Sequence, residues 1–188
     1  MQTPWKYIIA ALLAAPAYAQ PLQTILTCPL ADRTQVSLLA ETNAQGQRLF
    51  VKLDSKIQPA FTDIPDFDFF GEVFLAKCVS SSLIFAFAYG SPYLKGVVLR
   101  KNPVSHAVER IDFAEKALPR WLYLGREQIR LVIPNIGYEV SAKFLVYDYV
   151  AGKGQLEGPA GIETPPDRRG FKVVRLEQMT AQPARNNH

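Results

Sequence analysis

The sequence predicts an all-β protein: a single-domain antiparallel β-sandwich or barrel with at most one short helix. Short apolar segments recur at intervals set by turn residues, and helical periodicity is scarce. Apolar residues make up 48% of the chain, which is far from the composition of disordered proteins. A chain of this length can bury one core, so we expect one exported β-domain over 20–178 and a flexible C-terminal tail at 179–188.

Strand-like patterns follow one another along the chain. In 47–53 apolar and polar residues alternate, which predicts a strand with one solvent-exposed face. The segment 83–88 is apolar on both sides and is expected to be covered on both faces. Turn residues in 43–46 and 80–82 separate neighbouring segments at hairpin distance and predict antiparallel pairs. The expected strands are 34–41, 47–53, 70–79, 83–89, 95–101, 107–113, 121–124, 128–133, 138–149 and 170–177.

Two segments depart from the strand pattern. Asp112 with Glu115 three residues later resembles a capping box, and Pro119 is a stop signal, so we expect one short helix over 112–118. The stretch 151–170 is rich in glycine and proline and is predicted to be a long loop before the last strand.

The first nineteen residues predict a cleavable signal peptide. One cation, Lys6, precedes the uncharged run 7–15, and Ala17-Tyr18-Ala19 has the small-x-small pattern that signal peptidase recognises. The run is shorter than the roughly 20 residues that a membrane-spanning helix needs, and no later stretch approaches that length. Gln20, rather than the cysteine of a lipoprotein, follows the cleavage point. We therefore expect a periplasmic or secreted protein with no membrane span, cleaved near Ala19.

Export makes a disulfide between Cys28 and Cys78 the natural prediction, because exported proteins meet an oxidising environment. The alternative is two unpaired buried thiols. The chain has no C-x-x-C motif, and two cysteines with His106 make a poor ligand set for zinc. No metal or other cofactor is expected.

Residues for nucleophilic catalysis are scarce. Apart from the terminal His188, the only histidine is His106, and on a strand its neighbour Ser105 would point to the opposite face. Ser91 and Lys95 miss the Ser-x-x-Lys spacing of serine–lysine enzymes. We assign no catalytic residue and expect a protein that is not an enzyme.

Charge is unevenly distributed. The chain carries a net charge of +4, with an acidic stretch over 54–72 and basic stretches over 95–130 and 168–175. In the acidic stretch, acids alternate with phenylalanines in a pattern that fits an edge strand better than a calcium loop; a partner-contacting loop with loosely held calcium is the alternative. The basic stretches are either solvated faces or an anion-attracting surface. Nucleic acid is not an expected partner outside the cytoplasm.

Candidate binding residues lie in two places. Tyr89 and Tyr93 flank the turn residues Gly-Ser-Pro, and with Lys95 they would form a contact surface, because tyrosine combines apolar area with a hydrogen-bonding tip. Arg168 and Arg169 lie in the basic stretch near the C-terminus. A purely structural turn is the alternative for the tyrosines.

These observations predict a non-enzymatic exported binding protein of a bacterial-type cell envelope. Its partner would be an envelope protein or an anionic envelope component. One alternative is a carrier of a small apolar ligand, which requires a closed barrel with an interior cavity. Another is an envelope hydrolase, with a site assembled from distant carboxylates or from serine and lysine.

Overall fold

Strands and loops alone make up the part of the chain that the structure describes, which confirms the all-β class. A computed structural model describes residues 21–43, 46–64, 71–137 and 140–176. Within these ranges no helix is long and apolar enough to cross a membrane. The predicted signal peptide, the tail at 179–188 and residues 65–70 of the acidic stretch lie outside them.

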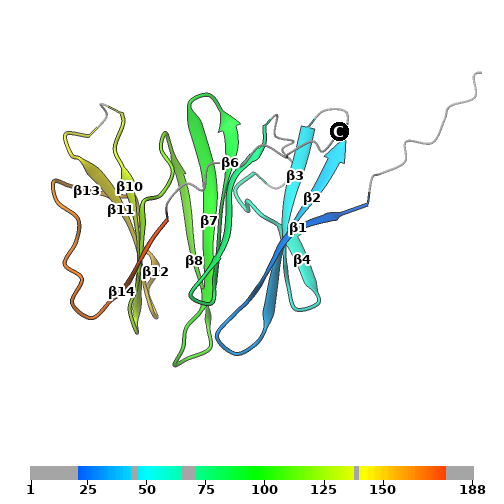
Figure 1. The fold of residues 1–188 in the computed structure, drawn as a ribbon, viewed down its shortest axis with the longest axis horizontal. Coiled ribbons are helices and arrows are strands. Elements are labelled where there is room, and N and C mark those ends of the chain that lie inside the picture. The colour runs from blue at the N-terminus through cyan, green and yellow to red at the C-terminus, as the bar shows by residue number, and fades with distance from the viewer. Residues whose placement is uncertain (1–20, 44–45, 65–70, 138–139, 177–188) are drawn as a thin grey trace, which may run out of the picture.

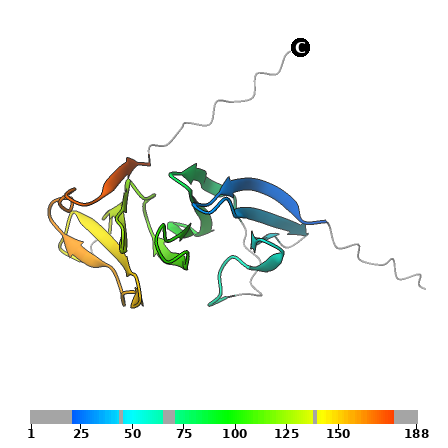
Figure 2. The same cartoon turned by 90° about the horizontal axis from the view of Figure 1, so that it is seen from below.

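Three antiparallel sheets are stacked side by side (Figures 1 and 2). The first sheet has the order β1-β2-β3-β4 and consists of β1 (Gln23–Pro29), β2 (Gln35–Asn43), β3 (Gly46–Leu53) and β4 (Lys56–Pro59). The middle sheet has the order β5-β6-β7-β8 and consists of β5 (Val73–Val79), β6 (Ser82–Gly90), β7 (Tyr93–Lys101) and β8 (Val108–Glu115).

The last sheet has the order β12-β11-β10-β9-β14, with β13 paired to β11. Its strands are β9 (Trp121–Leu124), β10 (Gln128–Pro134), β11 (Phe144–Val150), β12 (Gly154–Gln155), β13 (Ala160–Ile162) and β14 (Lys172–Arg175). The sequence left a sandwich and a barrel as alternatives. All three sheets are open, so the structure is a sandwich-like stack and not a closed barrel.

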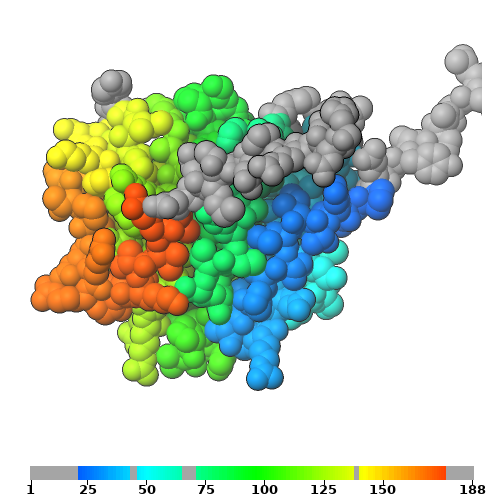
Figure 3. Space-filling model, in the orientation of Figure 1, coloured from blue at the N-terminus to red at the C-terminus, as the bar shows by residue number. Residues whose placement is uncertain are grey.

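The middle sheet is buried on both faces, as the apolar pattern of 83–88 predicts. Phe85 and Phe87 pack into the core shared with the first sheet, whereas Ile84 and Ala86 pack into the core shared with the last sheet. Successive side chains of a strand point to opposite faces, so one strand contributes to both cores. Figure 3 shows that side chains fill the spaces between the ribbons, and the three sheets form one continuous body.

The outer face of the last sheet carries a third, smaller cluster. Tyr123 and Val132 are fully buried there beneath Phe171 and other residues from the chain around β13 and β14. The Tyr123 hydroxyl donates a hydrogen bond to the Pro166 carbonyl oxygen at 3.1 Å. The segment 156–171 therefore covers this sheet, and it contains β13 where the sequence predicted only a loop.

The short helix expected over 112–118 is wrong. Asp112 and Glu115 belong to β8, which pairs with β7 along its whole length. Ile111 and Phe113 alternate into the second core, so a period-two apolar pattern outweighs the capping signal. β1, β4 and β12 were not among the expected strands, and in the described part of the chain the strands predicted at 70–79 and 138–149 begin at Val73 and Phe144.

Both predicted hairpins are confirmed. β2 pairs with β3, and β5 pairs with β6 through a two-residue turn in which Ser80 and Ser81 have φ of 47° and 60°. Two successive positive φ values are the geometry of a type I′ turn, whose twist matches that of the strands it joins.

The predicted disulfide is confirmed as well. Cys28 on β1 and Cys78 on β5 are bonded, with their Cα atoms 5.4 Å apart. The bond ties the first sheet to the middle sheet across 50 positions of sequence.

Replacing both cysteines by alanine (C28A/C78A) should lower the free energy of unfolding by about 4 kcal/mol, because the loop closed by the bond no longer restricts the unfolded chain. Urea denaturation of the variant and of the unaltered protein measures this difference. Reduction of the unaltered protein should give the same loss. Two alkylatable thiols in the unreduced protein would contradict the bond.

Candidate functional site

The predicted residues Tyr89 and Lys95 meet at the end of the β6–β7 hairpin, on the side that faces the first sheet. Lys95 Nζ lies 2.6 Å from Asp63 Oδ2, and 5.6 Å from the ring centres of both Phe61 and Tyr89. Only 11% of the Lys95 side chain is exposed, against 39% of Tyr89. Lys95 therefore positions its neighbours and offers little contact surface of its own.

The same ion pair sets the protonation of Asp63. Partial burial by itself would raise the pKa of this carboxyl, but the hydrogen bond and charge of Lys95 outweigh burial and hold the pKa below its usual value. Asp63 thus stays ionised and keeps Lys95 between the two rings.

Tyr93 lies on the other side of the hairpin. Its ring is 5.3 Å from Lys116 Nζ, and it lines a cleft of about 240 Å³ that is shared with the β10–β11 connection. We call this the apolar cleft; its apolar lining is Tyr93, Ile136, Val140, Leu145 and Pro159. Tyr93, Ile136 and Val140 are 43%, 61% and 46% exposed. The structure therefore separates the two tyrosines that the sequence placed in one surface.

Polar groups surround the apolar cleft. Glu115, Lys116 and Asn135 line it too, and Gly137 completes the lining. The Tyr147 hydroxyl donates a 2.6 Å hydrogen bond to Glu115 Oε1, and burial together with this carboxylate raises the pKa of Tyr147 well above its usual value. The lining thus combines apolar and polar residues, as protein-binding surfaces do.

Arg168 and Arg169 lie far along the chain from the tyrosines, in the connection between β13 and β14. The Arg169 guanidinium is paired with Asp167, and hydrogen bonds from the Arg169 backbone and side chain hold the pKa of Asp167 below its usual value. The Arg169 side chain is 92% exposed. No contact seen in the structure joins these arginines to the hairpin.

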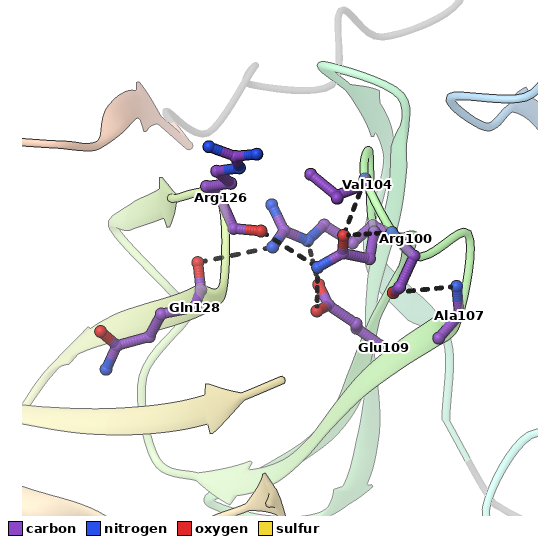
Figure 4. Close-up of polar contacts among 8 residues, drawn as sticks. Arg100, Val104, Ala107, Glu109, Arg126 and Gln128 are labelled. Carbon is purple, nitrogen blue, oxygen red and sulfur yellow. Dashed lines mark hydrogen bonds and ion pairs between the residues drawn. The ribbon is translucent and has the colours of Figure 1, made fainter. Parts of the chain in front are cut away.

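A buried polar network that the sequence did not predict lies at the other end of β7, away from Tyr93 (Figure 4). Arg100, Asn102 and Glu109 are 5%, 2% and 1% exposed. Arg100 Nε donates to Glu109 Oε2, and Asn102 Nδ2 donates to Glu109 Oε1 at 2.8 Å. Both carboxylate oxygens of the buried acid are therefore occupied.

The network also fixes two neighbouring loops. Asn102 Nδ2 donates to the Arg126 carbonyl oxygen at 3.0 Å, and Asn102 Oδ1 accepts the Val104 and Ser105 backbone N–H groups. Figure 4 shows the Arg126 carbonyl directed at the network and its side chain extending away. The signal available in the sequence was a cation, Arg100, directly after the apolar run 97–99, with an acid, Glu109, on the next strand.

A cleft of about 410 Å³ lies above this network. We call it the basic cleft, and its polar and charged lining is Ser80, Ser81, Arg100, Lys101, Arg126 and Lys172. On its rim Lys101 Nζ lies 2.6 Å from Asp32 Oδ2. Hydrogen bonds from Lys101 and Thr34 hold the pKa of Asp32 far below its usual range. Asp32 therefore stays ionised at physiological pH and compensates the charge of Lys101.

Neither a metal centre nor a relative identifies the site. Residues 21–43, 46–64, 71–137 and 140–176 contain no group of three or more His, Cys, Asp or Glu side chains that would hold a metal ion. No family model, no curated protein and no solved structure matches the chain. The function must be argued from the two clefts themselves.

Replacing Glu109 by alanine should lower the free energy of unfolding by about 3–5 kcal/mol, because Arg100 would remain buried without a counter-charge. The matched control is Glu163→Ala, which removes an acid 3.7 Å from Lys143 in an exposed pair and should cost less than about 1 kcal/mol. Chemical denaturation of both variants measures the losses. Equal small losses would contradict a structural role for Glu109.

Proposed function

We propose that this chain is a non-enzymatic exported binding protein of the cell envelope, and that it recognises a partner protein through the apolar cleft. The observation that carries the proposal is the group of exposed apolar side chains, Tyr93, Ile136 and Val140, around one concavity. Exposed apolar side chains gathered in this way, with polar groups beside them, are typical of protein-contact sites.

The chemistry of the cleft indicates what the partner offers. A volume of about 240 Å³ admits one or two apolar side chains, and the Tyr93 hydroxyl and the Lys116 ammonium are polar groups of the lining that can donate hydrogen bonds to the partner. Aromatic residues at the centre of such a surface commonly dominate the binding energy. We infer that the partner inserts an aliphatic or aromatic anchor.

Export is supported by two independent features. The N-terminal sequence has the charge, apolar run and small residues of a signal peptide. The disulfide between Cys28 and Cys78 is compatible with an oxidising compartment. Both are expected of a periplasmic or secreted protein.

Two other functions have less support. A carrier of an apolar ligand depends on a closed barrel, and the strands described here form three open sheets. A hydrolase depends on catalytic groups brought together, whereas Asp63, Glu109 and Asp148 each contact a cation. For neither the carrier nor the hydrolase does the structure offer support comparable to the exposed apolar cleft.

The Y93A/I136S variant should weaken partner binding by about tenfold or more, because it removes the aromatic and aliphatic walls of the cleft. The matched control is Y89A/I57S, which changes the same residue types where they are 39% and 46% exposed outside the cleft. Affinity capture from envelope extracts, followed by a binding measurement with the recovered partner, gives the comparison.

A photoreactive amino acid at position 136 should crosslink that partner, and the same group at position 57 should not. Capture that Y93A/I136S leaves unchanged, or that Y89A/I57S reduces equally, would contradict the proposal.

The exported protein should begin at Gln20, since cleavage after Ala19 fits the small-residue pattern. Intact-mass measurement of protein recovered from the periplasm or medium determines the N-terminus. Recovery of the uncleaved chain from the cytosol would overturn the export part of the proposal.

A further inference from the structure

The basic cleft is a second candidate site, separate from the apolar cleft. It lies where β7 and β9 end and β14 begins, whereas the apolar cleft lies near the start of β7 and the end of β10. Its lining includes four cationic side chains and no carboxylate. Such a concentration of one sign of charge attracts anions.

Charge pairing neutralises only half of these cations. Arg100 is held by Glu109 beneath the cleft, and Lys101 is held by Asp32 at its rim. Arg126 and Lys172 are exposed and have no side-chain hydrogen bond or ion pair to the described residues. Two cationic residues of the lining therefore have no counter-charge among the described residues.

Arg100, which lines the cleft, supplies a further donor. Arg100 Nη2 reaches the Gln128 carbonyl oxygen at 3.5 Å, while Nη1 carries no hydrogen bond to the residues drawn in Figure 4. Ser82, which pairs with Arg100 on the neighbouring strand, is fully buried and does not line the cleft, and its Oγ has no hydrogen-bond partner in the described part of the chain. The buried network fixes the Arg100 guanidinium in place before any ligand arrives, which lowers the entropic cost of binding.

The β5–β6 turn at Ser80 and Ser81, which we call the serine turn, is a separate indication of a ligand site at this end of the protein. Ser80 and Ser81 both have positive φ, a conformation that residues with a Cβ adopt at a cost and that Asn-Gly adopts more readily. Both serines line the cleft, where each hydroxyl can donate a hydrogen bond to an anion. Strained turns of this kind cluster at ligand sites.

We propose that the basic cleft binds a phosphomonoester group. A phosphate monoester carries close to two negative charges at pH 7 and three acceptor oxygens. These match the two uncompensated cations, the Arg100 guanidinium and the turn hydroxyls. The cleft, at about 410 Å³, is much larger than a phosphate group, so it has room for part of the sugar or glycerol that bears it.

The test is a calorimetric titration of the purified protein with glycerol 3-phosphate and with inorganic phosphate at constant ionic strength. The R126Q/K172Q variant should weaken binding of both ligands by at least tenfold, and each single variant should give an intermediate loss. Both side chains are exposed and unpaired, so the fold should persist, and thermal unfolding checks this. The matched control is K52Q/K56Q, which removes two exposed lysines of the first sheet and should bind as the unaltered protein does.

The outcomes separate clearly. If R126Q/K172Q and K52Q/K56Q bind the ligands equally weakly, the loss of affinity is an effect of net charge alone, which would overturn the proposal. Absence of saturable binding to the unaltered protein, or full binding by R126Q/K172Q, would overturn it as well. Because the apolar cleft is a different site, none of these results bears on the partner-binding proposal.

Flotation with vesicles distinguishes the source of the phosphate group. Binding to phosphatidic acid vesicles, but not to phosphatidylcholine vesicles, that is lost in R126Q/K172Q assigns the group to a lipid headgroup. Binding of glycerol 3-phosphate without vesicle flotation assigns it to a soluble molecule.

Discussion

The burial of the middle sheet on both of its faces is the constraint on which the rest of the structure depends. β6 carries apolar side chains on both sides, so a single covering layer would leave half of them in water. The first sheet and the last sheet supply the two layers, and the disulfide fastens the first of them. At Gly96 on β7 the Phe113 ring and the Phe85 backbone lie so close that a Cβ would be 2.3 Å from either, which shows how tightly the middle strands are packed.

Because the three open sheets are stacked, both candidate sites lie at the ends of the strands, one at each end of β7. Along the strands the spaces between sheets are filled by the two cores, and the clefts open where strands give way to turns. The two ends then differ in chemistry because different turns meet there. One end gathers Tyr93 and the apolar residues of the β10–β11 connection, and the other gathers Arg126 and Lys172 above a buried ion pair. A protein with two such ends can hold two different ligands at once, since neither site shares a residue with the other.

Much of this fold follows from local patterns, and what does not follow depends on long-range pairing. The apolar run 83–88 and the turns at 43–46 and 80–82 predicted a doubly covered strand and two hairpins, because period-two alternation and turn chemistry act over a few residues. The capping signal at 112–118 misled, because pairing with β7 decided the conformation. For the sites, exposure of Tyr89 and Tyr93 was predictable, but their separation onto two sides of a hairpin was not. The Arg100–Glu109 pair depends on the register of two strands, which one sequence does not reveal.

The serine turn and the buried ion pair show how stability and binding are related at the basic end. A buried charged pair is commonly no more stabilising than apolar residues of the same size, and serine is a poor choice for two successive left-handed positions. Selection for stability alone would favour an apolar pair at Arg100 and Glu109, and Asn-Gly at the turn. Both departures occur on the lining or directly beneath one cleft, and they supply what an anion requires: a fixed guanidinium and two hydroxyls. Departures from local rules that coincide in space are best explained by a shared ligand.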